Sequence, residues 1–228
     1  ISFVTDSALV RFIMRDEDKP TAEPDTFYLH ADSIFVTNDS SRKFESVMAY
    51  RHVKMYRDDA QGMCDSAFYL AADSLLQMFY DPVIWYDHYQ CTADTIVVKH
   101  DSSGAKIAYL NSDSFSIEQL DAEKFNQLKG RNTVIYFKEG EPEYSDILGN
   151  AEMVYYITED DKFGHKYLVG VNVGVGSDMR IYFKDRSPER VVTMGNPDMD
   201  TYPFEQLTAD KKQLDHFKVA SKDVTSEK

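Results

Sequence analysis

The sequence contains few of the residues on which compact disulfide or metal sites depend. Only two cysteines occur among 228 residues, Cys64 and Cys91, and neither lies in a CxxC or Cys/His pattern. Two cysteines are too few for a disulfide framework and lack the spacing of a structural zinc site. A bridge needs Cα atoms within roughly 7 Å, which spacing along the chain does not decide. A Cys64–Cys91 disulfide and two free thiols both stay open, and the sequence predicts no metal site and no cofactor.

Basic residues are also scarce. The chain has 25 Lys and Arg against 39 Asp and Glu, which gives a formal net charge of −14 with histidines neutral. Binding to a phosphate backbone depends on clustered Lys and Arg, so we predict no nucleic-acid partner. No stretch approaches the roughly 20 apolar residues that a membrane-spanning helix needs. The chain begins at Ile1 with no leader pattern, so we expect a processed chain or an excised segment.

Compact catalytic motifs are missing as well. The sequence has no GxSxG, HExxH or P-loop pattern, and its six histidines are scattered. The glycines of residues 170–176 do not have GxGxxG spacing and precede no helix, so a strand is the better interpretation. Two acidic pairs, Asp198 with Asp200 and Glu141 with Glu143, keep a carbohydrate-active enzyme as a third hypothesis. Such an enzyme needs two carboxyl groups held at a set distance across a cleft.

Alternating apolar and polar residues dominate the chain, which predicts an all-β protein. The clearest run is residues 167–176, where valines alternate with glycines and one asparagine, followed by a second strand over 179–184. Further strands are predicted at 34–36, 47–56, 67–70, 75–79, 83–86, 95–99, 106–109, 114–117, 133–138 and 153–158. With 43% apolar and 13% aromatic residues, the chain can bury a sizeable core.

A short phrase recurs along the chain: a small residue, then Asp, then Ser or Thr. Its aspartates are Asp6, Asp32, Asp73, Asp94 and Asp113, the last three 21 and 19 residues apart. A period of about 20 residues made of strands and turns is typical of stacked β rungs, so we predict an elongated stack or jelly-roll-like sheet. The aspartates could also form a cation-binding ladder, although Asp at such positions more commonly bonds the turn backbone.

The chain divides into four predicted parts. Residues 1–26 are expected to form a peripheral N-terminal strand and linker, with a loop over 16–24, and residues 27–204 the stacked β domain. Thr208 could cap a helix that runs to about Phe217, placed within 205–218, and this helix should dock on the sheet. Residues 219–228 are expected to be a disordered tail.

Three segments are apolar on both faces: residues 83–86, 134–137 and 154–157. A one-sided sheet cannot bury both faces, so either a second layer covers them or they line a groove. Strand parity and apolar character select eight candidates for inward-facing groove residues: Ile34, Val36, Ile96, Val98, Phe115, Ile117, Val171 and Val173. Parity does not decide whether they line a groove or fill a core.

Four phrases together resemble the OstA-like (LptA/OstA) family of lipopolysaccharide-transport proteins. They are YRHVKMYR at residues 50–57, QGMCDS at 61–66, DPVIW at 81–85 and QCTADT at 90–95. The similarity is best over residues 27–120 and thinner to Phe217. It implies a periplasmic or outer-membrane-associated β-jelly-roll or β-taco stack whose inner face shields acyl chains, without catalysis.

The resemblance also implies partners: lipopolysaccharide or a similar acyl lipid, other transport-machinery proteins through edge strands, and end-to-end self-association. An anionic lipid and a chain of charge −14 would meet through apolar contact, with Arg51, Lys54 and Arg57 as candidates for a polar rim. The alternative is a structural scaffold of a larger outer-membrane biogenesis protein, in which the same rungs form a packed core.

Overall fold

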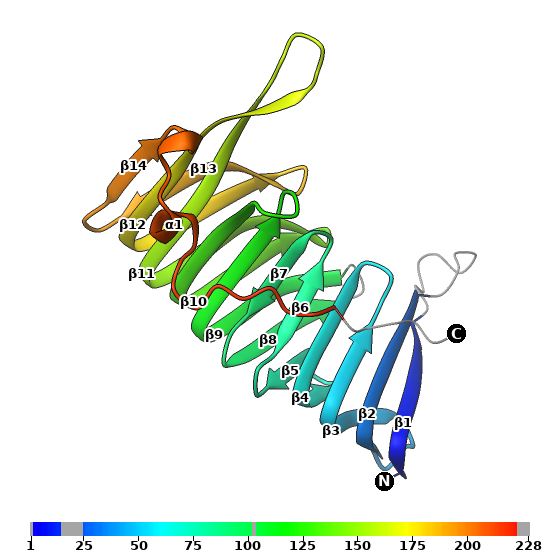
Figure 1. Cartoon of the computed structure of the whole chain (residues 1–228). Helices are drawn as coiled ribbons and strands as arrows, with labels where there is room; N and C mark the ends of the chain where they lie inside the picture. The colour runs from blue at the N-terminus through cyan, green and yellow to red at the C-terminus, as the bar shows by residue number, and fades with distance from the viewer. Residues whose placement is uncertain (1, 15–24, 102–103, 223–228) are drawn as a thin grey trace.

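A computed structural model describes residues 2–14, 25–101 and 104–222, and its architecture is all-β (Figure 1). The strands are β1 (Ser2–Met14), β2 (Asp25–Asn38), β3 (Phe44–Tyr56), β4 (Ala60–Leu70), β5 (Leu75–Phe79), β6 (Val83–Tyr86), β7 (Tyr89–Thr92), β8 (Thr95–Asp101), β9 (Gly104–Gln119), β10 (Phe125–Lys138), β11 (Glu141–Asp160), β12 (Lys166–Lys184), β13 (Ser187–Met194) and β14 (Asp198–Tyr202). A 3-10 turn, η1 (Phe204–Gln206), and a one-turn helix, α1 (Ala209–Lys212), follow. Among the described residues, no helix has the length and apolar character to cross a membrane.

The strands form one antiparallel sheet in which most neighbours are consecutive in the chain. The exceptions are β5, which pairs with β8, the β6–β7 hairpin, which pairs with β4 and β9, and β14, which pairs with β12. The main path runs from β1 at one end to β13 at the other, so the sheet is an elongated stack of strands (Figure 1). The predicted all-β stack is therefore confirmed. β1 is the edge strand of the same sheet and pairs with β2, so the expected boundary at residue 27 falls inside a paired strand.

Most long strands bend in the middle, where the register between neighbours shifts. Pairs of consecutive residues in the left-handed region mark several of these corners, for example Arg51–His52 and Ser112–Asp113. At the bend near Asp65, the pairing of β4 changes from β6 to β5. Corners at residues 6–7, 32, 94 and 112–113 coincide with the recurring Asp phrase, whereas Asp73 lies in the β4–β5 turn. Four of the five repeats therefore mark bends.

The bends divide the sheet into two layers that face each other. Layer A consists of residues 2–5, 33–38, 44–50, 66–70, 75–79, 95–101, 104–111, 132–138, 141–148, 178–184 and 187–194. Layer B consists of residues 8–14, 25–31, 53–56, 60–64, 83–86, 89–92, 114–119, 125–130, 151–160, 166–176 and 198–202. The largest apolar cluster combines side chains of both layers, so the core lies between them.

The predicted C-terminal helix is corrected by the structure, because α1 ends at Lys212. The side chain of Gln127 donates to the Lys212 carbonyl at 2.7 Å and accepts from the Leu214 N–H at 2.9 Å. These bonds take backbone groups that a longer helix would use internally. Residues 213–222 continue without regular structure, and Ala220 is still bonded to the sheet, so the expected tail is docked at least that far. The predicted loop at 16–24 lies outside the described residues, as does the tail from 223 to 228.

Candidate functional site

The interior between the layers is narrowest at the corners, where its side chains are smallest. Alanines within two residues of a corner are almost fully buried, and they are Ala8, Ala31, Ala49, Ala67 and Ala93. Small side chains are needed there because the two layers meet at the bend and leave little volume between them. Next to them lie Ile34 and Ile96, each 0% exposed. The corner side of the interior is therefore filled.

Along several strands the inward-facing side chains become more exposed with distance from the corner, and aromatic residues lie farthest out. Val36 and Val98 lie two residues farther out than Ile34 and Ile96 on the same faces, and both are only partly buried. Farther still are aromatic residues of the same cluster, among them Phe12 in layer B and Phe44 in layer A. The interior is thus a wedge, packed at the corners and partly open along the opposite side, which we call the open side.

An aromatic seam follows the open side at the N-terminal half of the stack; we define it as Phe12, Phe27, Phe44, Tyr69 and His100. Phe12 contacts Phe44 across the two layers with ring centroids 5.6 Å apart. The row continues by stacking of Phe44 on Tyr69 at 5.9 Å and of Tyr69 on His100 at 5.6 Å. Aromatic pairs of this kind contribute about 0.5–1.5 kcal/mol each beyond their buried area.

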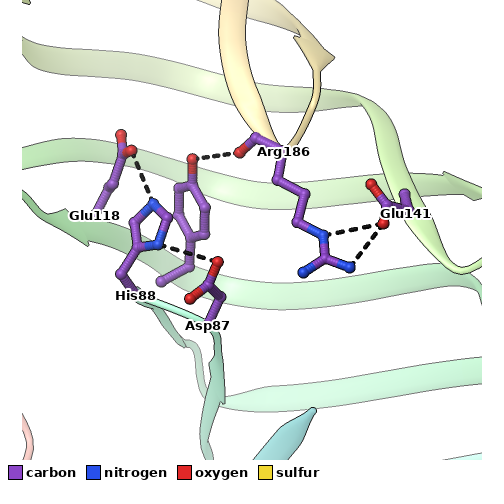
Figure 2. A network of polar contacts seen from close by, with 6 residues as sticks. Asp87, His88, Glu118, Glu141 and Arg186 are labelled. Carbon is purple, nitrogen blue, oxygen red and sulfur yellow. Dashed lines mark hydrogen bonds and ion pairs between the residues drawn. The ribbon is translucent and has the colours of Figure 1, made fainter.

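Polar contacts close the open side farther along the stack (Figure 2). Arg186, in the β12–β13 turn of layer A, donates from Nε and Nη2 to Glu141 Oε1 at 3.0 and 2.7 Å. Its guanidinium lies 5.6 Å from the ring centroid of Tyr86, and its carbonyl accepts from the Tyr89 hydroxyl at 2.7 Å. Tyr86 and Tyr89 flank the β6–β7 turn of layer B. We call these four residues the latch, because they join a turn of one layer to a turn of the other.

A buried carboxylate lies beside the latch. Glu118 is 9% exposed; its Oε2 accepts from Asn126 Nδ2 at 2.8 Å, and its Oε1 lies 3.1 Å from His88 Nε2 (Figure 2). Burial, and then the negative charge of Glu118, raise the pKa of Tyr89 well above its usual range. Tyr89 is therefore a neutral hydrogen-bond donor at physiological pH. The inner face of layer B is polar here, unlike the apolar interior at the seam.

The eight predicted groove residues fall into two groups. Ile34, Val36, Ile96 and Val98 belong to the cluster between the layers, as strand parity predicts. The other four are on the outer face of layer B. Phe115 packs against Phe217 of the C-terminal segment, and Val171 and Val173 belong to a separate cluster with Leu207 and Leu214.

The strand register explains why Ile117 faces outward, although strand parity predicts that it faces the interior. It is paired with Gln90 and Gln127, whose side chains hold the C-terminal segment, so all three point outward. The inward neighbours in this strand are Ser116 and Glu118. An apolar face indicates a covered face, and here the cover is the C-terminal segment rather than layer A.

The three predicted rim residues do not converge. Arg51 is exposed at a corner with φ 62°, and Lys54 lies on layer B between His30 and Met63. Arg57 is at the β3–β4 turn on the open side, where its guanidinium forms a bidentate pair with Asp59 at 2.5 and 2.7 Å. Of the three, Arg57 alone lies along the open side.

The two cysteines are free thiols in the structure. Strand β6 lies between their strands, β4 and β7, so the two backbones are about 9–10 Å apart at a strand spacing of about 4.8 Å. That separation exceeds the reach of a disulfide. Burial raises the pKa of the Cys64 thiol to about 12, so this thiol is un-ionised and unreactive in the folded chain.

The acidic pairs of the sequence do not form a two-carboxylate cleft with each other. Asp198 and Asp200 are exposed on edge strand β14, and the Tyr202 hydroxyl donates to Asp200 Oδ2 at 2.6 Å. Glu141 instead pairs with Arg186. Within the described residues, no three His, Cys, Asp or Glu side chains gather as a metal site, and the recurring aspartates Asp32 and Asp113 pair with His52 and His216.

Among the hollows on the surface of the described residues, two have volumes of about 230 and 350 Å³. The first lies beside the latch and is lined by Trp85, Tyr86 and Arg186 together with the acidic side chains Asp58, Asp59 and Asp87. The second lies at the C-terminal corners, around Glu152 and Asn196. Neither contains a predicted groove residue.

Sequence reasoning missed the seam, the latch and the glutamines that hold the C-terminal segment. The sequence contains a partial signal for the seam, because Phe12, Phe44 and Tyr69 are aromatic residues near strand ends. The latch had none, since Arg186 and Tyr89 are 97 residues apart. Gln90 and Gln127 look like ordinary polar positions of alternating strands.

No family model matches the chain, and no curated protein matches it significantly in sequence. Among solved structures, the chain is similar to LptH of Pseudomonas aeruginosa, described as the LptA-homologous periplasmic component of a lipopolysaccharide transport device. The two chains share 13% sequence identity with a TM-score of 0.47, over 63% of this chain and 95% of LptH.

Proposed function

We propose that the chain binds the acyl chains of a lipid between its two layers and helps to pass that lipid along, without catalysis. The observation that carries the proposal is the graded wedge, which is packed at the corners and bounded at the open side by partly exposed apolar and aromatic side chains. Acyl chains would enter by parting the layers at the seam. Each buried methylene contributes about 0.8 kcal/mol, so a few chains suffice for firm but reversible binding.

We further propose lipopolysaccharide as the lipid and the periplasm or outer membrane as the location, because the sequence phrases resemble the OstA-like family. Arg57 at the open side is the best-placed rim cation. Binding would rest mainly on apolar contact, since the chain carries a net charge of −14. The edge strands at the two ends of the stack, β1 and β13, are the proposed sites for partner proteins or for a second copy.

Site-specific photo-crosslinking to labelled lipopolysaccharide tests this proposal. A photoreactive residue at Val36 or Val98 should crosslink to the lipid, because both side chains line the partly open half of the wedge. Tyr109 is a matched control, because it is a large apolar residue of layer A that is 38% exposed on the outer face. Equal crosslinking at Tyr109 would indicate non-specific adsorption and contradict the proposal.

The second candidate function is a structural scaffold. It is favoured by the complete burial of Ile34, Ile96 and Met78, which shows that the corner half of the interior is already filled by side chains. In the same experiment, a folded protein that gives no crosslink at Val36 or Val98 would favour the scaffold over the lipid proposal.

A further inference from the structure

The C-terminal segment crosses layer B on its outer face, from Gln127 of β10 to Gln90 of β7. Figure 1 shows this segment passing in front of β10, β9 and β7 after α1. We call residues 212–222 the strap. After Lys212, the last residue of α1, it has no regular secondary structure, and it adds no strand to the sheet, so side chains of the sheet hold it.

Two glutamine side chains bind the strap backbone in the same way. Gln127 Nε2 donates to the Lys212 carbonyl at 2.7 Å, and Gln127 Oε1 accepts from the Leu214 N–H at 2.9 Å. Gln90 repeats the arrangement six residues later: its Nε2 donates to the Lys218 carbonyl and its Oε1 accepts from the Ala220 N–H, both at 2.8 Å. Both glutamines are buried, at 1% and 5% exposure. The two clamps recognise peptide backbone, whatever side chains the peptide carries.

One aromatic residue, one leucine and several charges supply further contacts. Leu214 packs against the apolar cluster that contains Val171 and Leu207. Phe217 lies between the clamps with its ring centroid 5.3 Å from Phe125 and 6.4 Å from Phe115. The strap carries three lysines and one aspartate on a chain of net charge −14. Its His216 faces Asp113 at 3.0 Å, and its Lys222 lines the hollow that contains Asp58, Asp59 and Asp87. The surface below the strap therefore complements a basic segment.

The glutamines belong to one straight row across the sheet. The register pairs Gln61 with Trp85, Trp85 with Gln90, Gln90 with Ile117, and Ile117 with Gln127. A glutamine thus occurs on every second strand of this part of layer B. The amide oxygen of Gln61 is buried without a hydrogen-bond partner among the described residues.

We propose that this row is a binding track for an extended, basic peptide segment with one aromatic residue, and that the strap is its exchangeable resident. A partner protein presenting such a segment would displace the strap, take over both glutamine clamps and place its aromatic ring against Phe115 and Phe125. The sheet keeps its own ladder when the strap leaves, because no strand pairing depends on the strap. The proposal is independent of what the interior binds.

The test uses a full-length variant with Leu214→Asp and Phe217→Asp, which weakens the resident strap. The probe is a fluorescein-labelled synthetic peptide of residues 211–222, and binding is followed by fluorescence anisotropy. We expect saturable binding to this variant and far weaker binding to the wild-type chain, whose own strap competes at an effective concentration of roughly millimolar order. A peptide with Phe217→Ala should bind about tenfold more weakly or worse.

Substitutions in the row separate track binding from simple charge attraction. Adding Gln90→Met removes one clamp at nearly constant volume and should weaken peptide binding about tenfold. Gln61→Met is the matched control and should weaken binding far less than Gln90→Met. Gln61 lines the same hollow as Lys222, but within the described residues the strap backbone is hydrogen-bonded to Gln90 and Gln127 and not to Gln61. Absence of saturable binding, or binding that ignores both Gln90 and Phe217, would overturn the proposal.

A second measurement serves if the strap variant does not fold. Hydrogen exchange of the wild-type chain reports the Leu214 and Ala220 amides, which the two glutamines accept from. An excess of the unlabelled peptide should speed exchange at both amides by displacing the strap. Unchanged exchange at saturating peptide would overturn the proposal in the same way.

Discussion

His100 lies on the open side, where its surroundings shift the pKa of its imidazole. Its ring stacks on Tyr69 with an interplanar angle of 13° and is half-buried at the end of the seam. Burial lowers the pKa of His100 below its ordinary value of 6.5, and the positive charge of Arg57 lowers it further, while the backbone and carboxylate of Asp101 act in the opposite direction. The folded chain therefore favours the neutral imidazole.

The lowered pKa of His100 makes stability depend on pH. At pH values between the folded pKa and the unfolded value of about 6.5, the unfolded chain binds more protons, so stability falls as pH decreases through this window and levels off below it. His100→Phe keeps an aromatic ring on Tyr69 but cannot titrate. Urea unfolding at pH values from about 7.5 to about 5.5 should show the variant losing less stability than the wild type. Equal pH slopes would contradict this account.

Residue identity predicts which side chains are covered, but it does not predict what covers them. Ile96 and Phe115 both lie on apolar faces of alternating strands and are buried at 0% and 5% exposure. Ile96 is covered by the opposite layer, whereas Phe115 is covered by Phe217, about 100 residues away in the chain. No local pattern distinguishes the two cases, because the difference depends on the path of a distant segment.

At the scale of elements, periodicity locates strands well where turns separate them. The predicted strands at 75–79 and 83–86 coincide with β5 and β6. Periodicity does not detect the corners, because the predicted strands at 106–109 and 114–117 are two arms of one bent strand, β9. The recurring Asp phrase predicts a strand repeat, but in four of its five copies it marks a bend. The C-terminal helix is shorter than the sequence predicts, because the sheet competes for its backbone groups through Gln127.

The latch joins two turns, and we expect its removal to affect the β6–β7 turn without destabilising the rest of the fold. Arg186→Ala removes the guanidinium from Glu141 and Tyr86, both of which are at least partly exposed, so the free energy of unfolding should fall only slightly. Hydrogen exchange should nevertheless become faster in residues 86–89, because the layer A turn no longer holds the β6–β7 turn.

Arg190→Ala is the matched control for the latch. Arg190 is on the same hairpin, and its guanidinium lies 3.9 Å from the ring centroid of Tyr182 within layer A. Its removal should leave exchange in residues 86–89 unchanged. A loss of several kcal/mol in the Arg186 variant, or equal exchange in both variants, would show that the latch is not a local bridge.

For the whole molecule, the two layers are joined covalently at the corners and held together by side chains along the open side. The contacts that hold the open side change along its length, from the aromatic seam to the polar latch. Side-chain contacts of this kind can open at small cost compared with breaking the sheet ladder, because exposed polar pairs and partly exposed rings contribute little each. Parting at the open side, with the corners as hinge, is the motion that the architecture permits.

That motion can be blocked at one point of the seam. In a variant with Cys64→Ala and Cys91→Ala, the further substitutions Phe12→Cys and Phe44→Cys provide two thiols that a short bis-maleimide can join across the two layers, since the native rings lie 5.6 Å apart. If acyl chains enter by parting the layers, the crosslinked protein should bind lipopolysaccharide at least about tenfold more weakly than the uncrosslinked one, which corresponds to about 1.4 kcal/mol. Tyr28 and Tyr56 provide the control pair, because they face each other on neighbouring strands within layer B, with centroids 6.2 Å apart. A crosslink there stiffens one layer and leaves the open side free, so binding should persist. Loss of binding in both crosslinked proteins, or in neither, would contradict entry of acyl chains by parting of the layers at this point of the seam.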